Sequence, residues 1–216
     1  MSNSTFSSPS IDDVRRALHQ PLPGKTAQVK MAPEMVAGEL DRWEEVEHYR
    51  EAGVLLLLYP HRTGSHSELH LALTRRREYP GVHSGQISFP GGRRENGETL
   101  EITALRETYE EVGVLPENLQ VIGQLSPLYT PPSNFCIYPF IGFSSTRPAF
   151  SLEPKEVAEL IETPLSLLLN PATCKQEIWS FPNYGERRVS FFDVFGHKVW
   201  GATAMMLSEF LVLLNG

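Results

Sequence analysis

The sequence predicts an α/β fold built around a central mixed β-sheet. Apolar runs of strand length and segments with helical periodicity follow one another irregularly along the chain, which is typical of a mixed sheet with helices packed on it. The chain has 216 residues, of which 41% are hydrophobic and 21% are charged. By area scaling, a chain of this size buries about 70% of its unfolded surface, so it can build a sizeable core.

The first 50 residues differ in composition from the rest and are expected to form a separate N-terminal segment. Residues 1–10 are rich in serine, which predicts disorder. The spacing of apolar residues predicts a helix over Ile11–Gln20, with Ser10 as its N-cap. Three prolines predict an extended connector at 21–33, and the acidic stretch 34–51 predicts at most a short helix.

The main domain is expected to span 51–216. It begins with a continuous apolar run, Ala52–Tyr59, which predicts a buried strand ended by Pro60. After a polar turn at 61–67, alternating residues predict a return strand at Glu68–Thr74. Shorter patterns predict strands at Gly85–Pro90, Val121–Leu128, Cys136–Phe143, Glu156–Ile161, Glu177–Phe181 and Arg188–Phe192, and helices at Glu98–Val112, Leu165–Leu169 and Gly201–Leu214.

Charge, cysteine content and hydropathy exclude several classes of protein. The formal net charge of -7 argues against nonspecific nucleic-acid binding, which needs a basic surplus. Two cysteines, Cys136 and Cys174, exclude a disulfide scaffold and are expected to be reduced packing residues. The N-terminus resembles no signal peptide, and the longest apolar run is far shorter than the roughly 20 residues that span a bilayer. The sequence therefore predicts a cytoplasmic protein that binds neither nucleic acid nor membrane.

The clearest helix of the sequence, Glu98–Val112, carries three carboxylates close together. Glu107 and Glu111 lie four residues apart and Glu110 flanks them, so the three converge within about one helical turn. We expect no cationic partner for them within the helix, and the macrodipole disfavours anions near its C-terminus. A solvated acidic face is the plain interpretation. A hard divalent cation such as Mg²⁺, which prefers oxygen ligands, would instead relieve the repulsion.

Neighbouring residues favour the interpretation of these carboxylates as a cation site. Gly91 and Gly92 precede the helix and allow the backbone to approach a ligand closely. Glu98 lies at the helix start, where a carboxylate is favoured. Arg106 follows just over two turns later on nearly the same side, so the two side chains can pair and tie the loop to the helix.

These residues belong to a longer pattern. The segment Gly92–Val114 resembles the Nudix box, Gly-x5-Glu-x7-Arg-Glu-U-x-Glu-Glu-x-Gly-U with U apolar. Every fixed polar and glycine position matches, and Thr108 stands where a bulkier apolar residue is usual. The resemblance implies an α/β/α sandwich around a mixed sheet. It also implies Mg²⁺- or Mn²⁺-dependent hydrolysis of a nucleoside diphosphate linked to another group.

The resemblance also implies roles by position. The metal ligands and catalytic residues would be Glu107, Glu110 and Glu111, with the Gly92 carbonyl as a further ligand. Glu98 and Arg106 would form a structural pair. Glu111 is the first candidate for the catalytic base, and the candidates outside the box are Glu153, Glu156 and Glu159.

A second resemblance narrows the substrate. Nudix coenzyme A pyrophosphatases carry Leu-Thr-x-Arg-(Ser/Ala)-x3-Arg-x3-Gly-x3-Phe-Pro-Gly-Gly before the box. Here Thr74, Arg76, Gly85 and Phe89–Gly92 match, whereas Arg77 replaces the small residue and Gly81 the second arginine. Two later segments also resemble that subfamily, Pro127–Phe135 and Val199–Ala204.

This resemblance implies cleavage of the diphosphate of coenzyme A or its derivatives to 4'-phosphopantetheine and adenosine 3',5'-bisphosphate. The substrate-binding residues would be Arg76, Arg75, Gly91 and Gly92. Arg76 is the candidate for reading a 3'-phosphate because it matches the subfamily motif, and strand alternation would put its two arginine neighbours on the opposite face.

Several alternatives stay open. The enzyme alternative is hydrolysis of ADP-ribose or another nucleoside diphosphate derivative, and the other class is a non-catalytic Nudix ligand sensor. The arginine run can equally be a solvated strand end, and Trp200 can pack in the core or stack on a base. A homodimer is also left open.

Overall fold

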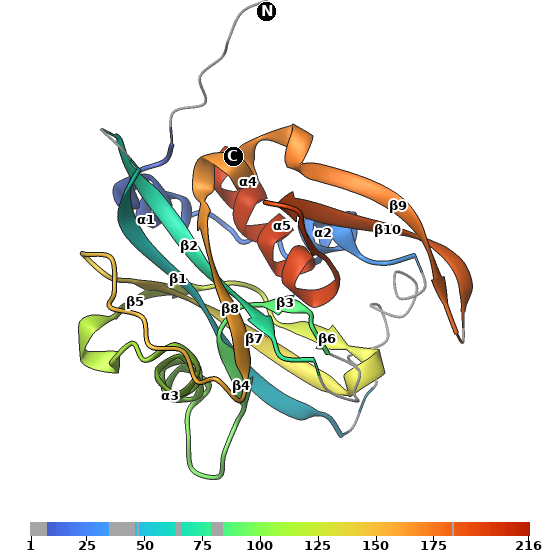
Figure 1. The fold of residues 1–216 in the computed structure, drawn as a ribbon, viewed down its shortest axis with the longest axis horizontal. Coiled ribbons are helices and arrows are strands. Elements are labelled where there is room, and N and C mark those ends of the chain that lie inside the picture. Colours follow the sequence, from blue (N-terminus) through green and yellow to red (C-terminus); the bar gives the residue numbers. More distant parts are fainter. Residues whose placement is uncertain (1–7, 35–45, 47, 64–65, 79–83, 183) are drawn as a thin grey trace, which may run out of the picture.

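A computed structural model describes residues 8–34, 46, 48–63, 66–78, 84–182 and 184–216. Eight strands of this described chain form a mixed central sheet with the path β3-β2-β1-β7-β5; β4 also pairs with β1, β6 with β7 and β8 with β2 (Figure 1). Only the β1–β7 pairing is parallel within these strands. The strands are β1 Arg50–Thr63, β2 His66–Arg76, β3 Ile87–Ser88, β4 Gly91–Arg93, β5 Gln120–Gln124, β6 Leu128–Thr130, β7 Phe135–Phe143 and β8 Val157–Pro164.

Strand β1 is buried on both faces, which explains its continuous apolar run. Alternate side chains enter two separate core clusters: Leu55, Leu57 and Tyr59 lie in one, and Val54, Leu56 and Leu58 in the other. The first cluster packs under helix α3 Leu100–Val112, and the second under helix α5 Gly201–Asn215. Layers of helix therefore cover both faces of the sheet, and the predicted α/β architecture with a central mixed sheet is confirmed.

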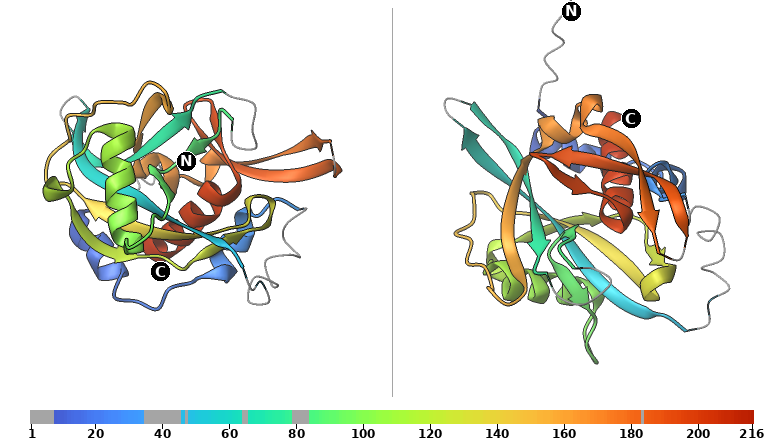
Figure 2. Two further views of the ribbon diagram at one scale, coloured as in Figure 1. Left: turned by 90° about the horizontal axis from the view of Figure 1, so that it is seen from below. Right: turned by 45° about the vertical axis from the view of Figure 1, so that its right-hand side comes forward.

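A second, three-stranded sheet lies beside α5 and is formed by β9 Cys174–Phe181, β10 Gly185–Val194 and β11 His197–Val199. The β9–β10 hairpin projects from the body of the molecule (Figure 2). The remaining elements are the helices α1 Ile11–Ala17, α2 Lys25–Gln28 and α4 Leu165–Leu169, and the 3-10 turns Val29–Met31, Pro116–Asn118, Pro131–Ser133 and Pro171–Thr173.

Several predicted boundaries differ from the structure for local reasons. Pro60 does not end β1. Strand β7 pairs with β1 only as far as Leu58, so no ladder hydrogen bond to β7 is lost where Pro60 lacks a backbone N–H. The two strands of this hairpin extend into the predicted turn, of which residues 64–65 lie outside the described chain. The strand predicted over Val121–Leu128 is two strands, β5 and β6, interrupted before Pro127.

At the N-terminus, α1 begins at the predicted cap. Ser10 and Asp13 form a reciprocal capping box, and the helix ends at Ala17, three residues earlier than predicted. The helix considered within 34–51 falls almost entirely outside the described residues. The described part of the N-terminal segment packs against the main core, because Val14 and Met31 are both buried in the cluster under α5.

The N-terminal segment is tied to α5 by a buried carboxylate. Glu209 is fully buried and accepts hydrogen bonds from the Gly24 N–H (3.2 Å), the Ser126 N–H (3.2 Å) and Gln28 Nε2 (2.8 Å). Ser208 Oγ donates to the Ala27 carbonyl at 2.7 Å. No helix in the described part of the chain is both long and apolar enough to cross a membrane.

Candidate functional site

The loop before α3 is tied to the helix by Glu98 and Arg106. Arg106 Nε lies 2.7 Å from Glu98 Oε1, and Nη2 donates to Oε2 at 3.2 Å. Thr103 Oγ1 and the Glu95 N–H donate to the same carboxylate. The Arg106 hydrogen bond is the largest of these influences, and together they lower the pKa of Glu98 to about 2. The structure thus brings Glu98 and Arg106 into contact, as their spacing predicts.

Arg106 also reaches two of the three clustered carboxylates. Its Nη1 lies 2.9 Å from both Glu107 Oε1 and Glu110 Oε2. The expectation that these carboxylates lack a cationic partner in the helix is therefore wrong. One guanidinium has enough donors to serve three carboxylates that lie within about a turn of it. It contacts only one oxygen each of Glu107 and Glu110, so the other oxygens are free of this arginine.

Glu111 is in a different state from its two neighbours. Its side chain is 3% exposed, and the nearest cation is Arg76, whose Nη1 lies 3.8 Å from Glu111 Oε1. Within the described chain, neither Glu111 Oε2 nor Arg76 Nε has a hydrogen-bond partner, although both atoms are buried. Burial is the main cause that raises the pKa of Glu111 to about 8, and Arg76 opposes it. A buried carboxyl with an unfilled acceptor is typical of a functional group.

The glycines before α3 are required by this packing. A Cβ on Gly92 would lie 2.5 Å from the Glu107 carboxyl, and one on Gly91 would lie 2.5 Å from the Gly53 carbonyl. Gly91 also has a positive φ of 153°. The backbone of β4 therefore runs directly beside Glu107, which only a residue without a side chain allows.

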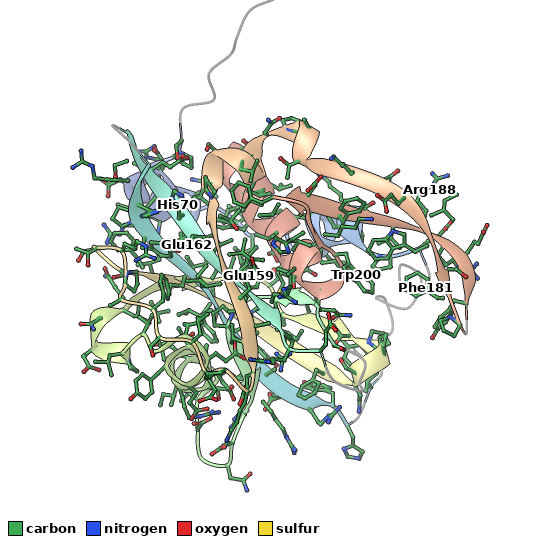
Figure 3. The ribbon with its side chains drawn as sticks, viewed as in Figure 1. His70, Glu159, Glu162, Phe181, Arg188 and Trp200 are labelled. Carbon is green, nitrogen blue, oxygen red and sulfur yellow. The ribbon has the colours of Figure 1, made fainter. Side chains whose placement is uncertain are left out.

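The two adjacent arginines of β2 face opposite ways, with a register shift between them. Arg76 faces Glu111, whereas Arg75 Nε pairs with Glu159 Oε2 at 3.0 Å. Glu159 lies on β8 (Figure 3) and also contacts His197 at 3.5 Å. The structure therefore does not bring Arg75 or Glu159 together with the α3 carboxylates.

The other candidates outside the box differ in position. Glu156 is close enough to raise the pKa of both Glu107 and Glu111 by charge repulsion. The backbone N–H of Glu153 donates to the Glu111 carbonyl at 3.0 Å, while its carboxylate accepts from the Lys155 N–H. Glu156 is therefore the acid outside the box that most directly affects the site.

Trp200 packs against aromatic residues of the second sheet. Trp200, at the start of α5 (Figure 3), is partly buried and meets Trp179 edge-on with ring centroids 5.2 Å apart. Phe181 on the hairpin lies 6.1 Å from it. Cys136 and Cys174 are both free thiols; Cys136 is buried, whereas Cys174 is exposed, so the prediction of a packing residue is wrong for Cys174. Aromatic packing thus accounts for the partial burial of Trp200.

The donor set of the site fits a hard divalent cation. As the side chains are placed, no three His, Cys, Asp or Glu residues of the described chain form a group that could hold a metal ion. Arg106 accounts for this, because it draws Glu107 and Glu110 to itself. Glu111 Oε1 and the second oxygens of the other two glutamates are nevertheless oxygen ligands of the kind that Mg²⁺ and Mn²⁺ prefer.

Sequence reasoning missed contacts that depend on strand register. Arg94 Nη1 pairs with Glu51 Oε2 at 2.6 Å, and Arg94 Nε donates to the Glu98 carbonyl at 2.8 Å. These contacts link β1 to the loop before α3. The pairing of β1 with β4 creates them, and no local pattern in the sequence indicates that pairing.

Comparison with known proteins identifies relatives of the chain. A profile of the NUDIX domain family matches residues 49–177. The uncharacterized Nudix hydrolase NudL of Pectobacterium atrosepticum is 41% identical over 172 residues, which cover 79% of this chain and 85% of that protein. The NudL protein of Photorhabdus laumondii is 33% identical over 141 residues, covering 64% of this chain and 74% of that protein.

Among solved structures, the MutT protein from Methanosarcina mazei Go1 is similar to this chain with a TM-score of 0.50. The sequence identity is 18%, and the match covers 79% of this chain and 98% of that chain. At this identity the likeness shows the fold alone.

Proposed function

Because the chain belongs to the Nudix hydrolase family and is a pyrophosphohydrolase of nucleoside diphosphate derivatives, we propose that its substrate is coenzyme A or a coenzyme A derivative. Water would attack one phosphorus of the diphosphate, the bridging P–O bond would break, and the products would be 4'-phosphopantetheine and adenosine 3',5'-bisphosphate. The observation that carries the proposal is the partial coenzyme A pyrophosphatase motif ending at Gly92. Its arginine, Arg76, faces Glu111 at 3.8 Å.

Nudix hydrolases generally use divalent cations such as Mg²⁺ or Mn²⁺. In our proposal Glu107, Glu110, Glu111 and the Gly92 carbonyl hold the cation. Bound there, it would neutralise diphosphate oxygens and lower the pKa of the attacking water. Before the cation binds, the ion pairs with Arg106 hold Glu107 and Glu110 in position.

Glu111 is the proposed catalytic base. Its carboxyl is buried and Oε2 has no partner in the described chain, so it can accept a proton without first losing a hydrogen bond. Burial also raises the pKa of Glu111 above its ordinary value, which favours uptake of a proton. Glu156 acts on it through charge repulsion.

Arg76 is proposed to bind the diphosphate itself. The sequence favours it as the reader of a 3'-phosphate, but its guanidinium lies beside Glu111, where the scissile bond must sit. A guanidinium can contact two phosphate oxygens at once. We therefore expect Arg76→Ala to raise KM for coenzyme A and for ADP-ribose by similar factors.

A substrate panel tests the proposed function. Purified enzyme with Mg²⁺ or with Mn²⁺ is incubated with coenzyme A, acetyl-coenzyme A, ADP-ribose and NADH, and the products are resolved by chromatography. We expect the highest kcat/KM for coenzyme A or its acyl derivative. A tenfold or larger preference for ADP-ribose would overturn the coenzyme A assignment and leave the family assignment intact.

A further inference from the structure

A hollow beside the proposed catalytic site contains two arginines that form no ion pair within the described chain. It has a volume of about 370 Å³ and is lined by residues 49–51 of the β1 end and residues 93–97 after β4. A second hollow of about 550 Å³ is lined by residues 93–96 together with Glu107. Arg93 borders both hollows, and the second hollow is also lined by Glu107, a carboxylate that we assign to the metal.

Strand pairing places Arg50 and Arg93 on the same face of the sheet. Arg93 is the register partner of Ala52 in the antiparallel β1–β4 pair, and Arg50 is two residues away from Ala52 along β1. Such diagonal neighbours have Cα atoms about 7–8 Å apart, which lets two long side chains reach one ligand. Gly53 and Gly92 present the opposite face to α3.

The arginines that line the hollow differ in whether a neighbouring carboxylate neutralises their charge. Arg94 is committed to Glu51, with 2.6 Å between Nη1 and Oε2. Arg50 has only neutral partners in the described chain: Nη2 donates to the Ser133 carbonyl at 2.5 Å, and its guanidinium lies 4.2 Å from the Phe135 ring centroid. These contacts fix the orientation of Arg50 without neutralising it.

Arg93 has still fewer contacts. It is exposed, and its side chain makes no hydrogen bond or ion pair within the part of the chain that the structure describes. Only its carbonyl is engaged, as acceptor for Arg106 Nη2 at 3.2 Å. Three arginines face two glutamates, Glu51 and Glu95, around this hollow, although the whole chain carries a net charge of -7.

We propose that Arg50 and Arg93 form a subsite for a phosphomonoester of the substrate, the 3'-phosphate of the adenosine half of coenzyme A. The assignment rests on the proposed function. A dianionic phosphate complements two guanidinium groups, of which one is held in place and the other is free to close on the ligand. Arg76, beside Glu111, serves the scissile diphosphate, so the two phosphate-bearing parts of the substrate have separate arginines.

Kinetics on a matched pair of substrates test the subsite. Dephospho-coenzyme A differs from coenzyme A only in lacking the 3'-phosphate. We expect Arg93→Ala to lower kcat/KM for coenzyme A ten- to hundredfold, the range for losing a charge-assisted contact, and to leave dephospho-coenzyme A nearly unchanged. Arg62→Ala, at the far end of β1, is the control and should alter neither. Equal losses on both substrates in Arg93→Ala would overturn the proposal.

A binding experiment separates failure of the subsite from failure of the proposed function. Calorimetry compares adenosine 3',5'-bisphosphate with AMP, neither of which needs to be hydrolysed. Wild type should prefer the bisphosphate tenfold or more, and Arg93→Ala should abolish that preference. If wild type hydrolyses no coenzyme A but shows this preference, the subsite holds and the reaction assignment falls. Equal affinities in wild type, or a preference retained in Arg93→Ala, would overturn the subsite.

Discussion

Two buried glutamates, one on each side of the central sheet, differ in how far their carboxyl groups are hydrogen-bonded. Glu209 on α5 is fully buried and accepts three hydrogen bonds. Glu111 on α3 is also buried, but its Oε2 has no hydrogen-bond partner in the described chain and the guanidinium of Arg76 lies 3.8 Å from Oε1. Burying a carboxylate is costly unless hydrogen bonds or charges compensate. Full compensation marks Glu209 as a structural anchor, whereas incomplete compensation marks Glu111 as a group kept ready for a ligand.

The largest expected effect comes from Glu111. Glu111→Gln should lower kcat by about 10²–10⁴-fold, the range for losing a positioned base, with any lost metal ligation adding to it. At pH 8 and above in metal-free buffer its melting temperature should rise, because the variant removes a buried charge that Arg76, 3.8 Å away, compensates only in part. Steady-state kinetics and thermal melts measure the two effects.

The matched control is Glu101→Gln, an exposed glutamate in the first turn of the same helix. It should alter neither kcat nor the melt. Full activity in Glu111→Gln would show that the unpartnered carboxyl is not the base and would shift attention to Glu156.

The converse effect is expected at Glu209. Glu209→Ala leaves the N–H groups of Gly24 and Ser126 and the Gln28 amide without their acceptor. We expect the free energy of unfolding to fall by about 3–5 kcal/mol, because three neutral donors lose their acceptor inside the fold. Urea denaturation measures the loss, and kcat of the folded fraction should not change.

Glu209→Gln sharpens this test, because it keeps the shape and one acceptor oxygen. It should lose less stability than Glu209→Ala. A fall in kcat comparable to that of Glu111→Gln would contradict the division between anchor and active group.

The sequence predicts one of these glutamates and not the other for a physical reason. The acidic turn around Glu111 breaks two local rules at once, since it concentrates like charges and places them near a helix C-terminus. Glu209 breaks no rule visible in the sequence, because a single glutamate in an apolar helix can equally face solvent. Its partners come from the N-terminal segment and the loop at Ser126, so only the packed fold brings them to it.

In the fold and in the rest of the site, too, the sequence predicts local features and not the contacts between distant segments. The run Ala52–Tyr59 and the Glu98–Arg106 spacing are local features, and the structure has the strand and the contact that they predict. Pro60 was expected to end β1, and its true setting depends on where the neighbouring strand β7 stops. The closeness of Arg50 and Arg93 likewise depends on the β1–β4 register, which no local pattern specifies.

A smaller effect is expected from the metal. Binding to the native state stabilises a protein by about 2.7 kcal/mol at 100 times Kd. Mg²⁺ or Mn²⁺ should therefore raise the melting temperature of wild type, and much less that of the double variant Glu107→Gln/Glu111→Gln. Glu209→Ala should keep the full shift from its own lower baseline. An identical shift in wild type and the double variant would place the cation elsewhere.

The effect that is smallest per pH unit is a change of stability with pH, to which Glu111 should contribute strongly. Its pKa is raised from 4.5 to about 8 in the folded state, mainly by burial. The native state therefore binds this proton more tightly than the unfolded state, so the contribution to stability is complete below pH 4.5 and is lost as the pH rises toward 8. For one proton the slope cannot exceed about 1.4 kcal/mol per pH unit. The lowered pKa of Glu98, about 2, acts only below its ordinary value of 4.5 and leaves this window unaffected. In metal-free buffer, urea denaturation from pH 5 to 8 should show wild type losing stability relative to Glu111→Gln. Parallel curves for wild type and Glu111→Gln would mean that Glu111 is ionised throughout this range.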